Sequence, residues 1–209
     1  MVRTPQDPER LRRFWDNQAG RYDRRMALAQ RLFGDTRAWL CGQAAGETLE
    51  IAIGTGMNLR HYPRDIRLTG MDLSPGMLRQ ARRRSAGPAD PTLTTGNAQQ
   101  LEFGDATFDT VVCTFSLCGV PDDRAAVVEM WRVLRPGGLL LLADHVVSTA
   151  LPVRLAQAAV ELVSIPVGGE HYRRRPIEHV RSTGFEIAVH ERFRLGTVER
   201  LVAHKPVRT

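Results

Sequence analysis

The sequence predicts an α/β fold: a seven-stranded, mostly parallel sheet with helices on both faces, a helical cover at the N-terminus and an antiparallel hairpin at the C-terminus. Short apolar runs alternate with helical segments from Glu47 onward, which is typical of a parallel sheet covered on both faces. The last two apolar runs, 184–191 and 197–204, lie close together and alternate apolar with polar residues, which indicates an antiparallel pair. Residues 5–45 show helical periodicity instead.

Each element follows from its local pattern. In residues 5–45, apolar side chains recur at helical spacing; they are Leu11, Phe14, Trp15, Tyr22, Met26, Ala29, Leu32 and Phe33. We expect Gly34 to end this stretch before a second helix through Trp39. Parallel strands are predicted at residues 48–53, 67–72, 92–97, 110–115 and 139–144, with helices at 74–84 and 122–135.

The predicted helix ends have chemical causes. Ser74 can accept a backbone hydrogen bond as an N-cap, and Pro75 suits the first helical position. The sequence RPGG at 135–138 stops the later helix and turns the chain into the next strand. The length of 209 residues suits one domain, which divides into a helical cap (1–45), a core (46–145), an insert on the substrate side (146–183) and the hairpin (184–209).

Composition argues against several classes of protein. The formal charge is +6, but basic residues are dispersed and aromatic residues make up only 6%, which argues against a nucleic-acid partner. Cys41, Cys113 and Cys118 have no metal-ligand spacing, and we expect no metal. The apolar run 138–143 is too short to span a bilayer. Residues 1–14 contain no secretory core, so the expected location is cytoplasmic.

A glycine turn follows the first predicted strand, in the sequence LEIAIGTG at 49–56. Gly54 and Gly56 allow the backbone to approach a ligand where a Cβ would collide, although a plain strand-to-helix turn explains the same residues. Asp72 ends the next strand, and in doubly wound folds an acidic side chain there binds a ribose diol. Asp72 could also cap the helix that follows, but its pairing with the glycine turn favours a ribose.

The residues around this turn argue against a dinucleotide. The dinucleotide fingerprint needs a third glycine, and Leu59 stands at that position. No basic side chain near the turn in the sequence could neutralise the negative charge of a diphosphate. Glu50, just before the turn, would repel a phosphate and suits a cation such as a sulfonium.

The turn belongs to an ordered set of motifs, with TGMDLSPGMLRQAR at 69–82, GNAQQLEFGDATFDTVVCTFSLCGVPD at 96–122 and VLRPGGLLLLADHV at 133–146. This set resembles the class I S-adenosylmethionine-dependent methyltransferases of the methyltransferase type 11 group, over roughly residues 10–205. The resemblance implies a Rossmann-like fold, with S-adenosylmethionine as cofactor and S-adenosylhomocysteine as product. Within the class, the chain is similar to ubiquinone/menaquinone and phospholipid methyltransferases. Residues 168–171 and 184–185 more weakly resemble small alkyl-thiol S-methyltransferases.

The resemblance also implies cofactor contacts. In that family the glycine loop and residues matching 113–116 face the methionine part, the carboxylate matching Asp72 takes the ribose, and the position of Asn97 and Ala98 lies against adenine. Ala52 stands where the family often has a third glycine, and Asn97 stands where aspartate is usual. We expect the cofactor site to tolerate both differences. The full set of expected cofactor contacts is Tyr22, Glu50, Ala52, Gly54, Thr55, Gly56, Asp72, Leu73, Met77, Asn97, Ala98, Gln99, Thr114, Phe115 and Ser116.

The acceptor is expected at the same edge, because ligands of open parallel sheets bind beyond the carboxyl ends of the strands. The N-terminal helices and the insert are expected to close this edge. The insert has apolar residues that fit an acceptor pocket or, alternatively, a helix packed on the sheet: Val153, Leu155, Ala158, Ala159, Leu162, Val163 and Ile165. Tyr22 matches a motif that folds over the cofactor in related enzymes, although simple helix packing also explains it.

Three residues are candidates for catalysis. His145 follows the fifth strand, and an unperturbed imidazole accepts a proton near neutral pH. Asp144 could orient His145 or could simply end the strand. His171, on a glycine-flanked loop, is the second candidate and Tyr22 the third. A site that uses neither histidine also stays open.

The predicted activity is direct methyl transfer to a small, largely apolar acceptor, which is a thiol, an amine or a hydroxyl. A thiol is slightly favoured because it is appreciably ionised at neutral pH, and carbon acceptors stay open. One alternative is a phospholipid or quinone methyltransferase at the membrane surface, where the basic segment 8–33 could lie on an anionic bilayer. Others are an RNA or protein methyltransferase and a cofactor-binding protein without turnover. Both a monomer and a homodimer are compatible with the sequence.

Overall fold

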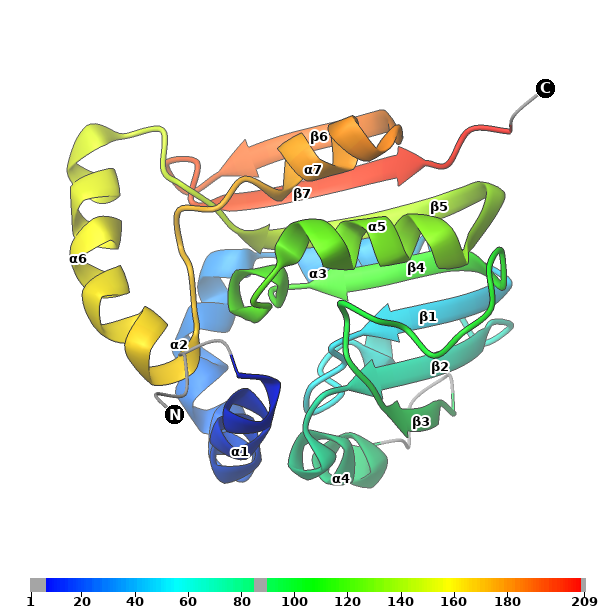
Figure 1. Ribbon diagram of the computed structural model, residues 1–209, viewed down its shortest axis with the longest axis horizontal. Coiled ribbons are helices and arrows are strands. Elements are labelled where there is room, and N and C mark those ends of the chain that lie inside the picture. Colours follow the sequence, from blue (N-terminus) through cyan, green and yellow to red (C-terminus); the bar gives the residue numbers. More distant parts are fainter. Residues whose placement is uncertain (1–6, 85–89, 208–209) are drawn as a thin grey trace.

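The structure is a computed structural model that describes residues 7–84 and 90–207, leaving aside the side chains of residues 28–32. Within these residues, seven strands form one sheet in the order β3-β2-β1-β4-β5-β7-β6 (Figure 1). Strand β7 runs antiparallel to β5 and β6, and the other neighbouring strands are parallel. The strands are β1 (Glu47–Ile51), β2 (Arg67–Asp72), β3 (Thr92–Thr95), β4 (Phe108–Thr114), β5 (Leu134–His145), β6 (Glu186–Phe193) and β7 (Val198–His204). The predicted fold class is confirmed.

Several strand ends differ from the prediction, and two of these differences have a clear structural reason. Strand β5 begins at Leu134 rather than 139, because Leu134 already pairs with Phe108 before the register shifts. The sequence RPGG at 135–138 therefore lies inside the strand and does not precede it. Strand β3 ends at Thr95 rather than 97. The Asn97 side chain accepts the backbone N–H of Gln99 at 3.0 Å, and such a local turn ends the extended chain.

The helical elements follow the predicted order along the chain. The N-terminal cover consists of α1 (Pro8–Gln18), α2 (Tyr22–Phe33) and α3 (Thr36–Cys41). Gly34 ends α2 with φ +58°, as predicted, whereas the expected helical start at Pro5 lies outside the described residues. The remaining elements are η1 (Leu59–His61), α4 (Pro75–Arg84), η2 (Leu117–Gly119), α5 (Asp123–Val133), α6 (Leu151–Gly168) and α7 (Pro176–Thr183).

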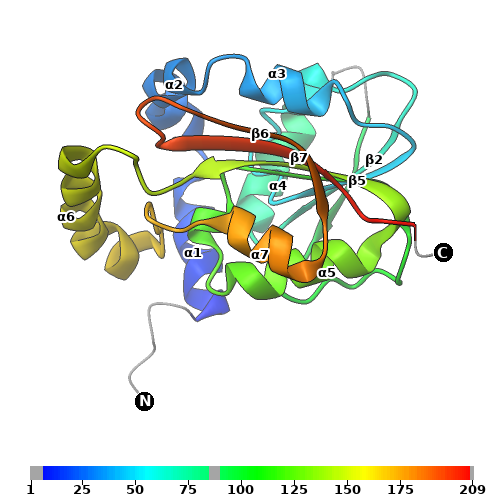
Figure 2. The same cartoon turned by 90° about the horizontal axis from the view of Figure 1, so that it is seen from above.

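Two apolar cores lie on opposite faces of the sheet. Helices α5 and α7 cover one face, where Met130 and Ile177 pack against the sheet. Helix α3 covers the other face with Leu40 and Cys41, as the view from above shows (Figure 2). Helix α6 covers neither face and projects from the carboxyl-end side of the sheet (Figures 1 and 2).

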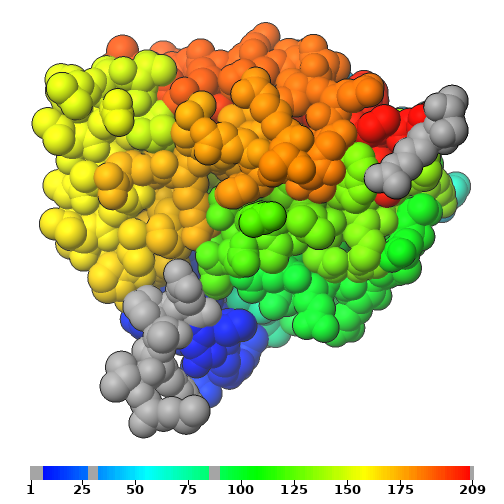
Figure 3. Space-filling model, turned by 45° about the horizontal axis from the view of Figure 1, so that its top comes forward, coloured from blue at the N-terminus to red at the C-terminus, as the bar shows by residue number. Residues whose placement is uncertain are grey.

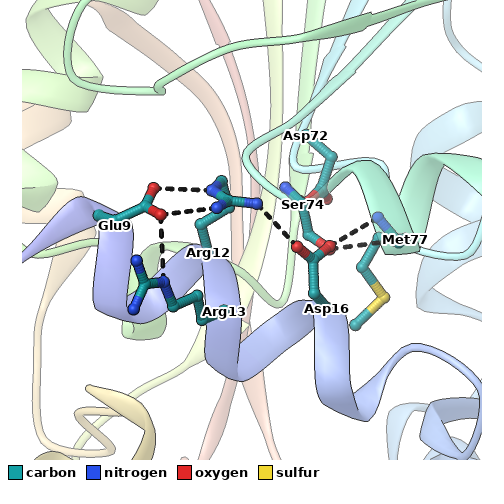
Figure 4. Close-up of polar contacts among 8 residues, drawn as sticks. Glu9, Arg12, Arg13, Asp16, Asp72, Ser74 and Met77 are labelled. Atoms are coloured by element: carbon teal, nitrogen blue, oxygen red, sulfur yellow. Dashed lines mark hydrogen bonds and ion pairs between the residues drawn. The ribbon is translucent and has the colours of Figure 1, made fainter.

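Helix α1 docks on the N-terminus of α4 through one carboxylate (Figure 4). Asp16 accepts the Ser74 hydroxyl at 2.6 Å and the Gly76 N–H at 2.7 Å. The Ser74 hydroxyl in turn accepts the Met77 N–H at 3.1 Å, so Ser74 is the N-cap that the sequence predicted. A carboxylate at a helix N-terminus is stabilised by the free N–H groups and the helix dipole. This contact holds the N-terminal cover over the carboxyl ends of the strands.

Candidate functional site

A cavity of about 1000 Å³, including its part open to solvent, lies beyond the carboxyl ends of β1, β2 and β4. This is the edge where open parallel sheets bind ligands. Most of the expected cofactor contacts line it: Tyr22, Glu50, Ala52, Gly54, Thr55, Asp72, Leu73, Met77, Asn97, Ala98, Thr114, Phe115 and Ser116.

The two glycines of the turn have different roles. A Cβ on Gly54 would come no closer to other residues than 3.9 Å, to the Ala52 carbonyl oxygen, so this glycine leaves the backbone open to the cavity. A Cβ on Gly56 would lie 2.8 Å from Leu59 Cδ1 and 3.2 Å from Ala81 Cα. Gly56 does not line the cavity. We expected it to admit a ligand, but it makes room for the packing of the turn against α4.

Asp72 faces the glycine turn from the end of β2. Its Oδ2 accepts the Gly54 N–H and its Oδ1 accepts the Ser74 N–H, both at 2.8 Å. An ionised carboxylate has about four acceptor positions, so two remain for further donors on the cavity side. Burial raises the pKa of Asp72 to about 6, although the two backbone hydrogen bonds act in the opposite direction. The side chain is therefore fixed in place and is mostly ionised at neutral pH.

Glu50 is a buried carboxyl group whose pKa burial raises to about 7. Asn58 donates to its Oε1 at 2.8 Å and the Tyr62 hydroxyl to its Oε2 at 2.9 Å. Glu50 also lines the cavity. A cation bound beside it would favour the ionised form and lower its pKa.

Arg37 is a cavity residue that the sequence analysis missed. It comes from α3, and its guanidinium donates to Asn58 Oδ1 and to Thr114 Oγ1, both at 2.8 Å. The guanidinium also lies 4.9 Å from the centre of the Phe115 ring. No basic side chain lies near the glycine turn in the sequence, but α3 brings this arginine into the cavity. One signal could have found it: Arg37 shares the buried face of its short helix with Leu40 and Cys41, where a charge needs a partner.

The N-terminal cover and the insert supply another wall of the cavity. Leu11, Trp15 and Tyr22 come from α1 and α2, and Glu170 follows α6. The Trp15 and Tyr22 rings meet edge to face, 6.1 Å apart. Burial raises the pKa of Tyr22 to about 12, so its hydroxyl is neutral at physiological pH. Burial also raises the pKa of Glu170, whose Oε2 accepts the Tyr172 hydroxyl at 3.3 Å.

Neither histidine candidate lines the cavity. The His145 ring lies among the rings of Phe33, Phe115 and Tyr172, at 5.1, 5.4 and 5.8 Å. Burial, with a smaller contribution from the Arg37 charge, lowers its pKa to about 4. Asp144 accepts the backbone N–H groups of Cys118 and His145, at 3.0 and 2.7 Å, inside a strand that ends at His145.

Other contacts occupy the side chain of Gln99, and His171 does not line the cavity. The Nε2 atom of His171 is buried without a hydrogen-bond partner among the described residues. The Gln99 side chain accepts the Asp122 N–H at 2.6 Å, which turns its amide toward α5. Catalytic roles for His145 and His171 remain predictions that the cavity geometry does not support.

The two raised carboxyl pKa values predict that cofactor affinity falls in acid. The sequence predicts that ribose hydroxyls donate to ionised Asp72 and that a cation lies beside ionised Glu50, so binding of such a ligand would favour the form in which both groups have lost their protons. With pKa values of about 6 and 7, affinity for S-adenosylmethionine, the ligand implied by the motifs, is expected to be about tenfold or more weaker at pH 5 than at pH 7. Isothermal titration calorimetry at the two pH values measures this. Equal wild-type affinities at the two pH values would contradict this prediction. An affinity that depends on pH in Asp72→Asn as strongly as in wild type would also contradict it.

Ala52 has a left-handed backbone, with φ +55°. This conformation costs an alanine about 1–2 kcal/mol, whereas glycine adopts it freely but loses more entropy on folding. Ala52→Gly is therefore expected to raise the free energy of unfolding by about 0.5–1 kcal/mol. Denaturant unfolding measures this, with Ala52→Val as the destabilised counterpart. A less stable glycine variant would show that the methyl group has packing contacts that outweigh the strain.

Comparisons with known proteins agree with this geometry. A sequence family described as "Methyltransferase domain" matches residues 49–142. Phosphatidylethanolamine N-methyltransferase of Cereibacter sphaeroides is 36% identical over 55% of this chain and 58% of its own length. Demethylmenaquinone methyltransferase of Renibacterium salmoninarum is 29% identical over 83% of this chain and 74% of its own length. A thiol S-methyltransferase of Mus musculus is 33% identical over 47% of this chain and 42% of its own length.

A solved structure shares the whole fold. An S-adenosylmethionine-dependent methyltransferase of Thermotoga maritima superposes with a TM-score of 0.71, over 93% of this chain and 99% of that chain, at 19% identity. The fold is thus one that S-adenosylmethionine-dependent methyltransferases have, and residues 49–142 match the methyltransferase domain family. The chain spans between 42% and 74% of the length of the three relatives described above.

Proposed function

We propose that this chain transfers a methyl group from S-adenosylmethionine to a small, largely apolar acceptor, with a thiol as the favoured kind. The observation that carries the proposal is the cavity itself. It combines a fixed carboxylate beside a glycine turn with an apolar and aromatic wall. One site thus offers contacts for a polar cofactor and for an acceptor with little polarity.

The residues present fit the cofactor. Asp72 would take the ribose hydroxyls with its two remaining acceptor positions. Arg37 is the basic side chain that would face the carboxylate of the methionine part, and Glu50 would face a positive charge. Bound S-adenosylmethionine supplies an electrophilic methyl group on a sulfonium. The chain contributes by aligning the two reactants, which can remove up to roughly 7–11 kcal/mol of barrier in favourable systems.

We place the acceptor against the wall that α1, the residues after η2 and Glu170 form, and not against the apolar side of α6. Leu11, Trp15, Val120 and Pro121 line the cavity. The apolar residues of the insert were expected to line it, but those that are large and exposed, such as Leu155 and Leu162, point to solvent. The apolar character of the proposed acceptor therefore rests on the other wall.

The acid–base groups of the cavity favour an acceptor that ionises easily. Tyr22 and Cys118 have raised pKa values and hold their protons at neutral pH. Glu170 is the carboxyl group on the acceptor wall, and its raised pKa makes it a better proton acceptor than an exposed carboxylate. A thiol needs little help from such a group, because its pKa is near 8.5, whereas a phenol near 10 needs more.

The test is a turnover screen with mass-spectrometric detection of methylated products, across alkyl and aryl thiols, amines, phenols, quinols and phospholipids. The proposal expects saturable S-adenosylmethionine binding and the highest kcat/KM for an apolar thiol. Cofactor binding without turnover of any acceptor would instead indicate a binding protein that does not catalyse transfer.

A quinone or phospholipid acceptor is the second candidate. The names of the relatives from Renibacterium salmoninarum and Cereibacter sphaeroides support it. Such acceptors have long apolar chains and reside in membranes, and the same screen distinguishes them. Faster methylation of a quinol or phospholipid than of any thiol would favour this candidate.

A further inference from the structure

The outer side of α6 is apolar along its whole length. Helix α6 has exposed apolar residues that cover about half of its circumference at 3.6 residues per turn: Leu151, Pro152, Leu155, Ala156, Ala159, Val160, Leu162, Val163, Pro166 and Val167. Leu162 is 78% exposed and Val163 66% exposed. A surface helix of a soluble domain normally turns such a stripe toward the core. In α6 the arrangement is inverted.

The polar residues of α6 fix this orientation. Gln157 donates to the carbonyl oxygens of Val146 and Tyr172, at 2.9 and 3.0 Å. Glu161 is buried and accepts the N–H groups of Tyr172 and Arg173, at 2.7 and 2.9 Å. Ser164 donates to the Glu170 carbonyl oxygen at 2.8 Å. Rotation of the helix would break these hydrogen bonds, so the fold itself holds the apolar side outward.

The exposed apolar surface continues beyond the helix. Leu195, 66% exposed, lies on the turn between β6 and β7. Its carbonyl oxygen accepts the Thr149 N–H at 3.0 Å, which places it beside the start of α6. We call the outer residues of α6 together with Leu195 the apolar face. The space-filling view shows α6, in yellow to yellow-green, at one corner of the molecule (Figure 3).

Basic residues lie near both ends of the apolar face. Arg154 is exposed on α6, and Arg194 precedes Leu195 on the turn. At the other end of the helix, Arg10 donates to the Pro166 carbonyl oxygen. The acidic residue of α6, Glu161, points inward and is paired with Arg173. An apolar helix face with basic residues at its border suits the surface of an anionic bilayer.

We propose that the apolar face docks on an anionic lipid surface, with α6 lying in the plane of the interface. A second copy of this chain fits less well, because a symmetric contact between two apolar faces would bring Arg10, Arg154 and Arg194 toward the arginines of the other copy. Residues 151–168 have the length and mean hydropathy of a membrane span, and 11% of them are buried. The hydrogen bonds from the middle of α6 to residues 170–173 hold the helix along the domain, so it lies on the membrane and does not cross it.

The docked orientation would bring the acceptor wall of the cavity to the lipid. The C-terminal end of α6 packs on α1, where a Cβ on Gly168 would lie 2.9 Å from Phe14 and one on Gly169 2.9 Å from Leu11. Leu11 and Glu170 line the cavity. An apolar acceptor dissolved in the bilayer could then reach the cavity along α1. This last step rests on the proposed function, whereas the docking itself does not.

Vesicle flotation of the full chain tests the proposal, with equimolar phosphatidylcholine and phosphatidylglycerol and with phosphatidylcholine alone. Wild type is expected to float with the anionic vesicles and far less with the neutral ones. Leu155→Glu/Leu162→Glu is expected to reduce the bound fraction about tenfold or more, since it places two charges on the apolar face. Val128→Glu is the matched control, because Val128 is an apolar residue of α5 that is 45% exposed and lies outside this face. It is expected to bind as wild type does.

The flotation results that would overturn the proposal are no flotation with anionic vesicles, equal flotation with neutral vesicles, or equal flotation of the double variant. A concentration-dependent dimer that the double variant dissociates would also overturn it, since the face would then belong to a second copy. Thermal unfolding and S-adenosylmethionine binding of both variants serve as folding controls. Turnover of a water-soluble thiol separates this proposal from the proposed function, because failed docking with intact turnover contradicts the docking alone.

Discussion

Replacing Asp72 by alanine is expected to weaken S-adenosylmethionine binding by about 10²–10⁴-fold. Two hydrogen bonds from ribose hydroxyls to an ionised carboxylate contribute about 1.5–3 kcal/mol each, and each 1.4 kcal/mol corresponds to about a factor of ten. The variant also removes the acceptor for the N–H groups of Gly54 and Ser74, so part of the loss comes from a less ordered turn. Isothermal titration calorimetry with S-adenosylmethionine and S-adenosylhomocysteine measures the effect.

The controls for this variant separate binding from folding. Asp72→Asn keeps the shape and one acceptor oxygen, and it is expected to fall between wild type and alanine. Asp65→Ala removes an exposed carboxylate of the segment before β2 and is expected to bind normally. If Asp72→Ala unfolds cooperatively and still binds within threefold of wild type, roughly 0.6 kcal/mol, the ribose assignment is wrong.

Replacing Arg37 by methionine is expected to weaken S-adenosylmethionine binding by about 10–150-fold, the equivalent of one charge-assisted hydrogen-bonded contact of about 1.5–3 kcal/mol. Methionine keeps much of the volume between Asn58 and Thr114 but removes the charge. The comparison ligand is 5′-methylthioadenosine, which has the adenosine but lacks the amino acid. Its affinity is expected to change little in the variant, because it brings no carboxylate to position 37.

The two ligands make this prediction specific. A loss of affinity for both ligands would mean that Arg37 acts by holding the cavity together through its bonds to Asn58 and Thr114. Unchanged affinity for both would remove Arg37 from the cofactor site. Only the selective loss supports contact with the carboxylate of the methionine part.

The parts of the site that lie close together in the sequence were predictable. The glycine turn, Asp72 and the Ser74 N-cap are set by strand ends and by local backbone hydrogen bonds. The period of apolar residues also predicted the strands and the antiparallel pair. These features depend on neighbours along the chain, and one sequence carries that information.

The parts that depend on tertiary packing were not predictable in the same way. Arg37 reaches Thr114, 77 positions further along the chain, and Glu170 comes to the cavity because α6 packs on α1. The histidines at the strand end and on the insert loop were natural candidates for a base, yet an aromatic cluster holds His145 off the cavity. For α6, composition indicated either an apolar pocket or a helix packed on the sheet. The polar stripe of Gln157, Glu161 and Ser164 was the signal that its apolar side faces outward.

The most direct test of the account is a crystal structure of the chain with S-adenosylhomocysteine. The account predicts the ribose hydroxyls within hydrogen-bond distance of Asp72, the adenine beside Asn97 and Ala98, and the amino-acid end beside Arg37. A product bound with its ribose away from Asp72, or outside this cavity, would contradict it.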